Sequence, residues 1–322
     1  MQRVLVTGAG GFIGSHLVTY LKERGYWVRG VDLKRPEFGD TKADEFLLLD
    51  LRKAEDCLTA TRGVEQVYAL AADMGGMGFI SSNHGTILRN NALIDLHTFE
   101  AARENGVGRY LYTSSACIYP EHLQTETQVR GLKEDDAFPA APQDAYGWEK
   151  ILGELICKYG GDEFGIDTRT VRFHNIFGPD GTFQGGREKS PAAMCRKVAL
   201  AEENGSIEVW GDGEQTRSFC YIDDCVEGLY RLMQSDYRLP LNLGTDRMVS
   251  INELAQIVIG ISGKSGISLE HVDGPQGVRG RNSDNERLRE ILGWEPQTTL
   301  EDGLERTYGW IAAQLQQHAA AA

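Results

Sequence analysis

The stretch Arg3-Val4-Leu5-Val6-Thr7-Gly8-Ala9-Gly10-Gly11-Phe12-Ile13-Gly14 decides the fold of this 322-residue chain. Strand-forming residues run directly into a glycine-rich turn, and apolar residues at helical spacing follow over residues 15–23. A strand, a tight turn and a helix in this order form the first half of a βαβ unit. The sequence therefore predicts that a Rossmann-type sheet begins here.

Glycines at positions 8, 11 and 14 have the spacing of a dinucleotide-binding turn. They permit a tight turn, close approach of backbone N–H groups to a pyrophosphate, and close packing of the helix on the strand. The N-terminus of the helix adds partial positive charge. The predicted cofactor-binding residues of this turn are Gly8, Gly11, Phe12, Ile13 and Gly14.

Asp32 closes the second predicted strand, where a carboxylate can accept hydrogen bonds from the adenosine ribose. A carboxylate repels a 2′-phosphate, so Asp32 favours NAD over NADP, although Lys34 and Arg35 close behind it are able to pair with such a phosphate. Asp50 and Leu51 follow the third predicted strand and are placed to contact the adenine. On spacing alone, an ordinary acid and a core leucine fit these two positions equally well.

Short β-rich runs alternate with helical patterns through the first half of the chain. Predicted strands cover residues 4–6, 27–31, 46–49, 67–70, 109–113 and 168–172, and helical spacing recurs over residues 15–23 and 92–105. This alternation predicts an α/β fold, a doubly wound parallel sheet covered by helices. Residues 1–177 are assigned to the dinucleotide-binding domain and residues 178–322 to a smaller C-terminal substrate-binding lobe. Parts of residues 219–245 are candidates to return to the first domain.

Charge and composition narrow the choice of partner. A net charge of -14 and a pI near 5.0 argue against nucleic acid or an anionic membrane surface. The sequence has no run of about 18 apolar residues, as a membrane-spanning helix needs. The first residues lack a signal-peptide pattern, and six cysteines without framework spacing indicate reduced thiols, so a cytoplasmic location is expected. No residue grouping has metal-ligand spacing, and residues 318–322 are left out of the fold prediction.

Tyr146 and Lys150 are four residues apart, which places them on one face of a helix. A free tyrosine has a pKa of about 10, so a tyrosine base at neutral pH needs its pKa lowered by roughly three units. The ammonium of Lys150 and the positive nicotinamide of NAD are able to lower it. Ser115, at the end of the fifth predicted strand, completes a catalytic group typical of nicotinamide-dependent enzymes.

These residues resemble the extended short-chain dehydrogenase/reductase superfamily, also called the NAD-dependent epimerase/dehydratase superfamily, over nearly the whole chain. More specific strings are similar to the GDP-mannose 3,5-epimerase family within it. They are ADMGGMGFI (residues 72–80), SSACIYP (114–120), GGREK (185–189) and GVRGRNSD (277–284).

The resemblance implies a chemistry for each matched residue. Tyr146 takes the proton of the sugar 4-hydroxyl while NAD oxidises C4, Lys150 lowers the tyrosine pKa and holds the nicotinamide ribose, and Ser115 hydrogen-bonds the same oxygen. The 4-ketone acidifies the hydrogens at C3 and C5, and inversion needs groups on opposite faces of the sugar. The family pattern makes Cys117 the base and Lys189 the acid. The implied reaction converts GDP-D-mannose to GDP-L-galactose, with GDP-L-gulose as a candidate second product.

A nucleotide diphosphate needs cationic and amide donors. Family-like strings supply Asn175, Arg217 and Arg279, and Lys197 is a further candidate, whereas His174 is expected to support the site by hydrogen bonding without taking part in catalysis. The full set of predicted substrate-binding residues is Gly75, Met77, Ser115, Asn175, Lys189, Lys197, Arg217 and Arg279. The family also implies a homodimer.

Several alternatives remain open. GDP-4-keto-6-deoxymannose epimerase/reductase shares the SSxCIYP-type string, but it consumes NADPH and pairs its cysteine with a histidine, so Asp32 and Lys189 argue against it. A UDP-hexose 4-epimerase does not need Cys117 and Lys189, and a 4,6-dehydratase needs an acid just after the serine. A non-catalytic NAD-sensing scaffold is the alternative from another class, which the complete catalytic set disfavours.

Overall fold

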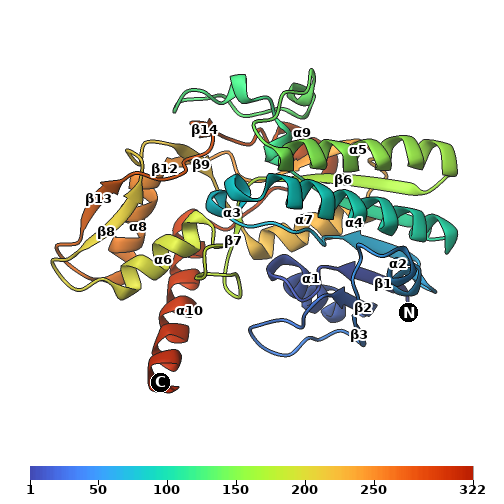
Figure 1. Cartoon of the computed structure of the whole chain (residues 1–322), viewed down its shortest axis with the longest axis horizontal. Helices are drawn as coiled ribbons and strands as arrows, with labels where there is room; N and C mark the ends of the chain where they lie inside the picture. Colours follow the sequence, from blue (N-terminus) through green and yellow to red (C-terminus); the bar gives the residue numbers. More distant parts are fainter. Residues whose placement is uncertain (322) are drawn as a thin grey trace.

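A seven-stranded parallel sheet with the strand order β3-β2-β1-β4-β5-β6-β11 forms the centre of the molecule (Figure 1). The structure is a computed structural model and describes residues 1–321. The strands of this sheet are β1 Arg3–Thr7, β2 Trp27–Asp32, β3 Glu45–Leu48, β4 Gln66–Ala69, β5 Arg109–Ser115, β6 Asp167–Phe173 and β11 Pro240–Leu243. The predicted doubly wound α/β fold is confirmed.

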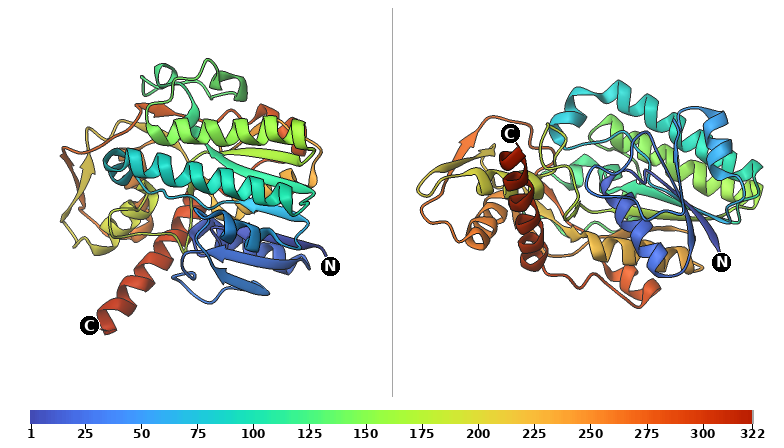
Figure 2. Two further views of the ribbon diagram at one scale, coloured as in Figure 1. Left: turned by 45° about the vertical axis from the view of Figure 1, so that its right-hand side comes forward. Right: turned by 90° about the horizontal axis from the view of Figure 1, so that it is seen from below.

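Helices cover both faces of the sheet, as right-handed crossovers between parallel strands require. The helices α2, α4 and α5 lie together on one face, and α1 and α7 lie on the other (Figures 1 and 2). Their bounds are α1 Phe12–Glu23, α2 Ala54–Thr61, α4 His84–Glu104, α5 Ala145–Phe164 and α7 Ile222–Gln234. The short helix α3 Met77–Ser82 precedes α4.

Strand β1 shows why this sequence forms a sheet that is buried on both faces. Val4 and Val6 pack into one hydrophobic cluster, and Leu5 between them packs into another. Successive side chains of a strand point to opposite faces, so a run of apolar residues without polar alternation requires helices on both sides.

One helix boundary differs from the sequence prediction. Helix α4 begins at His84, well before the predicted start at residue 92, because Asn90 and Asn91 interrupt the apolar pattern although both are buried. Their side-chain amides hydrogen-bond to Asp73. The strand predicted at residues 168–172 is β6, and β11 pairs with it in parallel register.

The rest of the chain forms smaller sheets and three helices that contact one another, α6, α8 and α10. The elements are η1 Ala116–Ile118, η2 Glu121–Leu123, η3 Glu134–Ala137, β7 Ile176–Phe177, α6 Ser190–Leu200, β8 Ser206–Trp210, β9 Thr216–Ser218, β10 Cys220–Tyr221, β12 Met248–Ser250, α8 Ile251–Ser262, β13 Ser268–Val272, β14 Gly280–Arg281, α9 Glu286–Leu292 and α10 Leu300–Ala321. Residues 318–321, which the sequence prediction left out, continue α10. No helix in residues 1–321 is long and apolar enough to cross a membrane.

An aromatic cluster joins the two halves of the molecule. Phe38, from the loop between β2 and β3, meets the edge of the Trp310 ring at a centroid distance of 4.8 Å. Phe183 lies 5.4 Å from Trp310 and 5.9 Å from Phe38. The loop after β2 is therefore fastened to α10 and to the segment that precedes α6.

The close approach of α1 to the first turn generates a prediction. A β-carbon on Gly14 would lie 2.1 Å from the carbonyl oxygen of Gly8, so Gly14→Ala should lower the free energy of unfolding by about 1–3 kcal/mol through overpacking. Gly309 in α10 has nothing within 4 Å of its added β-carbon, and Gly309→Ala should raise it by about 0.5–1 kcal/mol. Urea denaturation of the NAD-free protein measures both. Equal effects of the two substitutions would contradict the packing argument.

Candidate active site

The predicted cofactor and catalytic residues gather at one edge of the central sheet. Asp32 ends β2, Ser115 ends β5, and the turn that contains Gly8 follows β1. All strands of this sheet are parallel, so these carboxyl ends meet at the same edge. Ligands of open α/β sheets bind there.

The turn after β1 has the shape of a pyrophosphate cradle. Gly8 adopts a φ of +68°, in the left-handed region that favours glycine. A β-carbon on Gly10 would lie 2.0 Å from the carbonyl oxygen of Lys34, whereas one on Gly11 would meet only the carbonyl oxygen of Gly8, at 3.3 Å. Gly11 caps α1 and lines a cavity together with Phe12 and Ser15 from the first turn of the helix, so these residues fit a dinucleotide.

Asp32 is fixed by backbone groups. The Gly10 N–H donates to its Oδ2 at 3.0 Å, and the Lys34 N–H donates to Oδ1 at 3.3 Å. Gly10 is not among the cofactor-binding residues predicted from the sequence, although its place between Gly8 and Gly11 in the motif indicates such a role. A cavity beside the turn is lined by Gly10, Gly11, Phe12, Ser15, Lys34, Pro36, Glu37, Phe38, Asp180 and Thr182.

Asp50 and Leu51 occupy the positions of a paired acid and a core leucine. Two nitrogens of Arg52 donate to the Asp50 carboxylate at 2.8 Å each, and this hydrogen bonding lowers the pKa of Asp50. Leu51 is 4% exposed and packs in the hydrophobic core. Their contact with an adenine stays a prediction.

Tyr146 and Lys150 lie on the first turns of α5, and both are buried. Lys150 Nζ is 5.7 Å from the centroid of the Tyr146 ring. Burial raises the pKa of Tyr146 above its usual range, and the charge of Lys150 opposes that rise. Lys150 lowers the pKa of Tyr146, as expected from the sequence. In the protein without ligands, however, desolvation raises this pKa by more than Lys150 lowers it.

Cys117 lies in η1, two residues beyond Ser115. The Ser115 hydroxyl accepts a hydrogen bond from the Cys117 N–H at 3.1 Å, which fixes the start of η1. Cys117 packs against the cluster that contains Tyr146. Nη1 of Arg281, on β14, donates to the Cys117 sulfur at 3.2 Å, so a cation lies beside this thiol, as it does beside reactive cysteines. Arg281 is not among the site residues predicted from the sequence.

Lys189 faces the same cysteine from the start of α6. Burial lowers the pKa of Lys189, and the thiols of Cys117 and Cys225 oppose this shift. The loop after β4 lies alongside, because the Gly76 N–H donates to the Arg187 carbonyl at 3.0 Å. A β-carbon on Gly76 would lie 2.4 Å from the carbonyl oxygen of Glu188, so the glycine-rich loop and the GGREK segment meet here.

Arg217 on β9 lacks a carboxylate partner among residues 1–321. Its guanidinium donates to the carbonyls of Thr216, Gln276 and Val278. Burial, and after it the charge of Arg281, lowers the pKa of Arg217 to about 9. Met77 lies beside this guanidinium, since a β-carbon on Gly277 would be 3.2 Å from the Met77 sulfur and 3.4 Å from Arg217 Nη2.

Four other predicted residues lie outside this cluster or have partners already. Arg279 forms two hydrogen bonds of 2.7 Å with the Asp212 carboxylate near the surface. Lys197 Nζ donates to the Glu208 carbonyl at 2.7 Å. Asn175 has a φ of +47° and donates to the Ser218 carbonyl at 2.8 Å. His174 is fully buried against Asn242, and burial lowers its pKa to about 3, so it is neutral.

The arrangement suits proton transfer at an oxidised carbon. Tyr146 packs beside Cys117. Three cationic side chains act on these two groups: Lys150 on the tyrosine, and Lys189 and Arg281 on the thiol. The part of the chain that the structure describes has no group of three or more His, Cys, Asp or Glu side chains that could hold a metal ion.

Comparisons with known proteins agree with this geometry. The model of the NAD dependent epimerase/dehydratase family matches residues 4–244. GDP-mannose 3,5-epimerase of Arabidopsis thaliana is 53% identical over 320 residues, which cover 99% of this chain and 84% of that protein. GDP-L-fucose synthase of Escherichia coli is 29% identical, with 96% of both chains covered. A crystal structure of UDP-glucuronic acid 4-epimerase from Bacillus cereus, in complex with UDP-glucuronic acid and NAD, is similar with a TM-score of 0.82 and 25% identity, covering 98% of this chain and 100% of that one.

The contact between Arg281 and Cys117 predicts selective thiol chemistry. Cys117 is the one cysteine of the six that is not buried, so iodoacetamide should alkylate it first at pH 7. Arg281→Gln removes a charged hydrogen-bond donor worth roughly 1.5 kcal/mol, and the alkylation rate should fall about tenfold. Mass spectrometry of the labelled peptide measures the rate. Arg279→Gln is the matched control and should leave the rate unchanged, and an equal loss in both variants would contradict the role of Arg281.

Proposed function

The chain belongs to the NAD dependent epimerase/dehydratase family, and on that premise we propose that it converts GDP-D-mannose to GDP-L-galactose by inverting C3 and C5 of the hexose. The observation that carries the proposal is the convergence of Cys117 and Lys189 beside Tyr146. A 4-epimerase needs no second acid–base pair, whereas inversion at two neighbouring carbons requires one. The 53% identity to an Arabidopsis GDP-mannose 3,5-epimerase supports the same reaction.

The first step makes the neighbouring carbons acidic. When bound, NAD supplies a reversible oxidation of C4. Tyr146 takes the proton of the 4-hydroxyl, Lys150 provides positive charge behind the tyrosine, and Ser115 hydrogen-bonds the same sugar oxygen. The cradle of Gly8, Gly11, Phe12, Ile13 and Gly14 holds the pyrophosphate, Asp32 holds the adenosine ribose, and Asp50 and Leu51 line the adenine.

Inversion needs a proton removed from one face of the sugar and returned to the other. Cys117 acts as the base, and Nη1 of Arg281 donates a hydrogen bond to its sulfur at 3.2 Å. Lys189, the residue that caps α6, acts as the acid that returns a proton to the other face of the sugar. Burial lowers the pKa of Lys189, which makes its ammonium a better proton donor than an exposed lysine.

Cations and amides around the cluster hold the GDP-sugar. Arg217, whose guanidinium hydrogen-bonds only carbonyl oxygens among the described residues, is the central diphosphate ligand. Gly75 and Met77 form a wall beside the sugar ring. Asn175, Lys197 and Arg279 complete the proposed substrate set, with Arg279 exchanging Asp212 for phosphate when substrate binds.

The proposal divides the chain by ligand. Residues 1–177, together with the segment around 219–245 that contributes α7 and β11, hold NAD, and the remainder of 178–322 holds the nucleotide sugar. Free thiols at all six cysteines suit a reducing compartment, and the cytoplasm is the proposed location.

Isotope exchange tests the function. GDP-mannose incubated with the NAD-loaded protein in D2O should gain deuterium at C3 and C5, because both protons leave as the 4-ketone forms and return from solvent. Proton NMR reads the loss of the two signals. Cys117→Ala and Lys189→Ala should each stop inversion at C3 and C5 while NAD stays bound, and Tyr146→Phe should block the oxidation that precedes it. Protons retained at both carbons with the wild-type protein would sink the proposal.

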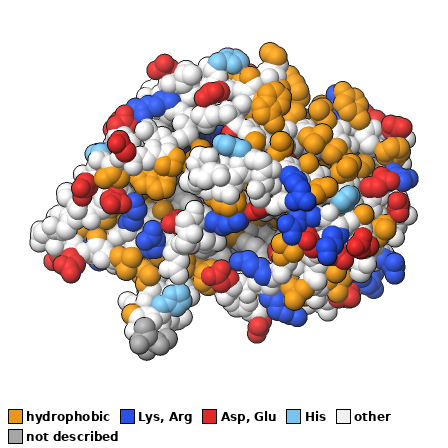
Figure 3. All heavy atoms as spheres, in the orientation of Figure 1, with side chains coloured by type: hydrophobic (Ala, Val, Ile, Leu, Met, Phe, Trp, Pro, Cys, Tyr) orange, Lys and Arg blue, Asp and Glu red, His pale blue; other side chains and the backbone are white. Residues whose placement is uncertain are grey.

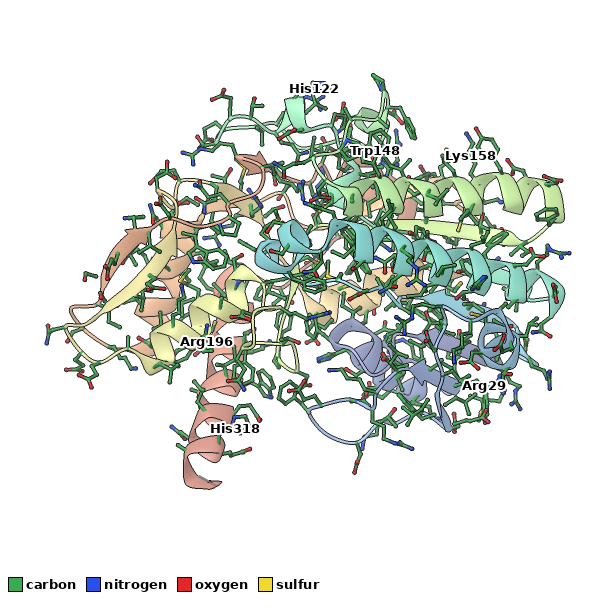
Figure 4. The ribbon with its side chains drawn as sticks, viewed as in Figure 1. Arg29, His122, Trp148, Lys158, Arg196 and His318 are labelled. Carbon is green, nitrogen blue, oxygen red and sulfur yellow. The ribbon has the colours of Figure 1, made fainter. Side chains whose placement is uncertain are left out.

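A homodimer is the proposed assembly. Figure 3 shows hydrophobic side chains gathered over α4 and α5 on the face of the molecule that Figure 1 presents. Leu96 on α4 is 51% exposed, and Trp148 and Leu152 on α5 are 50% and 43% exposed. Trp148 lies near the start of α5 (Figure 4). Two adjacent helices with apolar outer positions suit the self-complementary interface of a twofold dimer.

Charges placed on that face should separate the dimer. The double variant Leu96→Glu/Leu152→Glu should halve the mass measured by light scattering at micromolar concentration, because carboxylates would be buried without partners at the interface. Leu200→Glu, at a residue that is 59% exposed on α6, is the matched control and should keep the wild-type mass. A monomeric wild-type protein would refute the assembly without touching the catalytic proposal.

A further inference from the structure

A buried cluster of ionisable groups surrounds the Lys150 amine. Asp95 comes from α4, Tyr112 from β5, and Glu149 and Lys150 from α5. The Tyr112 hydroxyl oxygen is 2.7 Å from Asp95 Oδ2, 3.4 Å from Glu149 Oε1 and 3.2 Å from Lys150 Nζ. Each of the four residues is at most 6% exposed.

The fold makes room for this cluster at some cost to α5. A β-carbon on Gly153 would lie 2.1 Å from the Tyr112 hydroxyl oxygen, so the tyrosine rests directly against the helix backbone. Glycine inside a helix lowers its stability relative to alanine. The glycine is explained by the space that Tyr112 needs in order to reach the acids and the lysine.

The charges of the cluster do not balance if every group takes its usual state. Two carboxylates face one ammonium, and an unpaired charge without solvent is costly, so one carboxyl has to keep its proton. Burial and the charge of Glu149 raise the pKa of Asp95 well above its usual value. Glu149 accepts a hydrogen bond from Asn91 Nδ2 at 3.1 Å and lies 3.4 Å from Lys150 Nζ.

The cluster acts on the catalytic tyrosine through the lysine. The charge of Lys150 lowers the pKa of Tyr146, whereas the charge of Glu149 raises it. The negative charge behind Lys150 therefore determines how much of the lysine's field reaches the tyrosine. The other titratable groups that face these residues are Cys117 in η1, Cys157 in α5 and Tyr110 in β5.

We propose that Asp95 and Glu149 are positioning residues that share one proton and together hold a single negative charge against Lys150, which limits how strongly Lys150 favours the ionised form of Tyr146. This role rests on the proposed function, in which Tyr146 is the base of the first step. Sharing has a specific consequence: when either carboxyl is removed, the remaining one ionises and keeps the charge of the cluster at the same value.

Infrared difference spectroscopy of the NAD-loaded protein at pH 7, without substrate, tests the sharing. The wild-type protein should show the carbonyl stretch of one un-ionised carboxyl that is absent from Asp95→Asn. The same band should also be absent from Glu149→Gln, because Asp95 then ionises. A band that persists in Glu149→Gln would overturn the proposal, since Asp95 would be protonated independently of its neighbour.

A matched control separates sharing from general damage to α5. Glu154 lies on the same helix, is 6% exposed, and pairs with Arg172 through hydrogen bonds of 2.8 and 2.7 Å. Glu154→Gln breaks a buried ion pair of the same kind without touching the cluster. This variant should therefore keep the carboxyl band at wild-type intensity, and loss of the band here would overturn the assignment to Asp95.

The pH dependence of C4 oxidation tests the effect on Tyr146. The rate rises with pH as the tyrosine ionises, and removing negative charge behind Lys150 stabilises the tyrosinate. The rising limb of Asp95→Asn/Glu149→Gln should therefore move to lower pH by about one unit or more, and each single substitution should move it less. An unmoved limb in the double variant, or a full shift in one single variant, would overturn the proposal.

The two measurements also separate this proposal from the function itself. The infrared band needs no substrate, so it decides the sharing even if the double variant does not fold. A wild-type protein that leaves GDP-mannose unchanged while both single variants lose the band would reject the proposed function and retain the shared proton.

Discussion

Desolvation of charge at the carboxyl edge of the sheet is the constraint on which the rest of this structure depends. A buried ion has lost its water, so it needs a partner within the protein or a ligand that will supply one. Arg172 has Glu154, and Lys150 has Glu149. These pairs are satisfied by the fold alone, and they orient the groups around the site.

Two cations at the same edge lack such a carboxylate among the described residues. Arg217 hydrogen-bonds only carbonyl oxygens, and Lys189 faces the sulfur atoms of two cysteines. Groups of this kind are stabilised when an anion arrives, which fits a diphosphate and a sugar whose neighbouring protons are removed.

The site also spans both halves of the molecule, because Cys117 comes from the central sheet side and Arg281 from the small sheet of β12, β9 and β14. The contact of Phe38 with Trp310 fastens the same two halves together.

The sequence predicted the features that depend on local pattern. The glycine-rich turn, the acid that ends β2 and the pair Tyr146 and Lys150 are separated by spacings that a strand or a helix sets, so the parallel sheet and the catalytic helix followed from them. The start of α4 was wrong because Asn90 and Asn91 are polar yet buried. The emphasis on Arg279 in place of Arg281 has a tertiary cause, since Asp212 captures one arginine and Cys117 meets the other. Asp95 carried no signal, because its importance arises only where α4, β5 and α5 meet.

The contact between Tyr112 and Gly153 also limits how this chain can diverge. An added β-carbon at position 153 would lie 2.1 Å from the hydroxyl oxygen and 2.2 Å from the ring carbon that bears it, so even a phenylalanine at 112 would not relieve the overlap. Relatives in which position 153 is not glycine should therefore have lost the aromatic ring at 112 beforehand. Geometry therefore sets the order of the two replacements, with position 112 changing first. Among homologues, the two positions should covary.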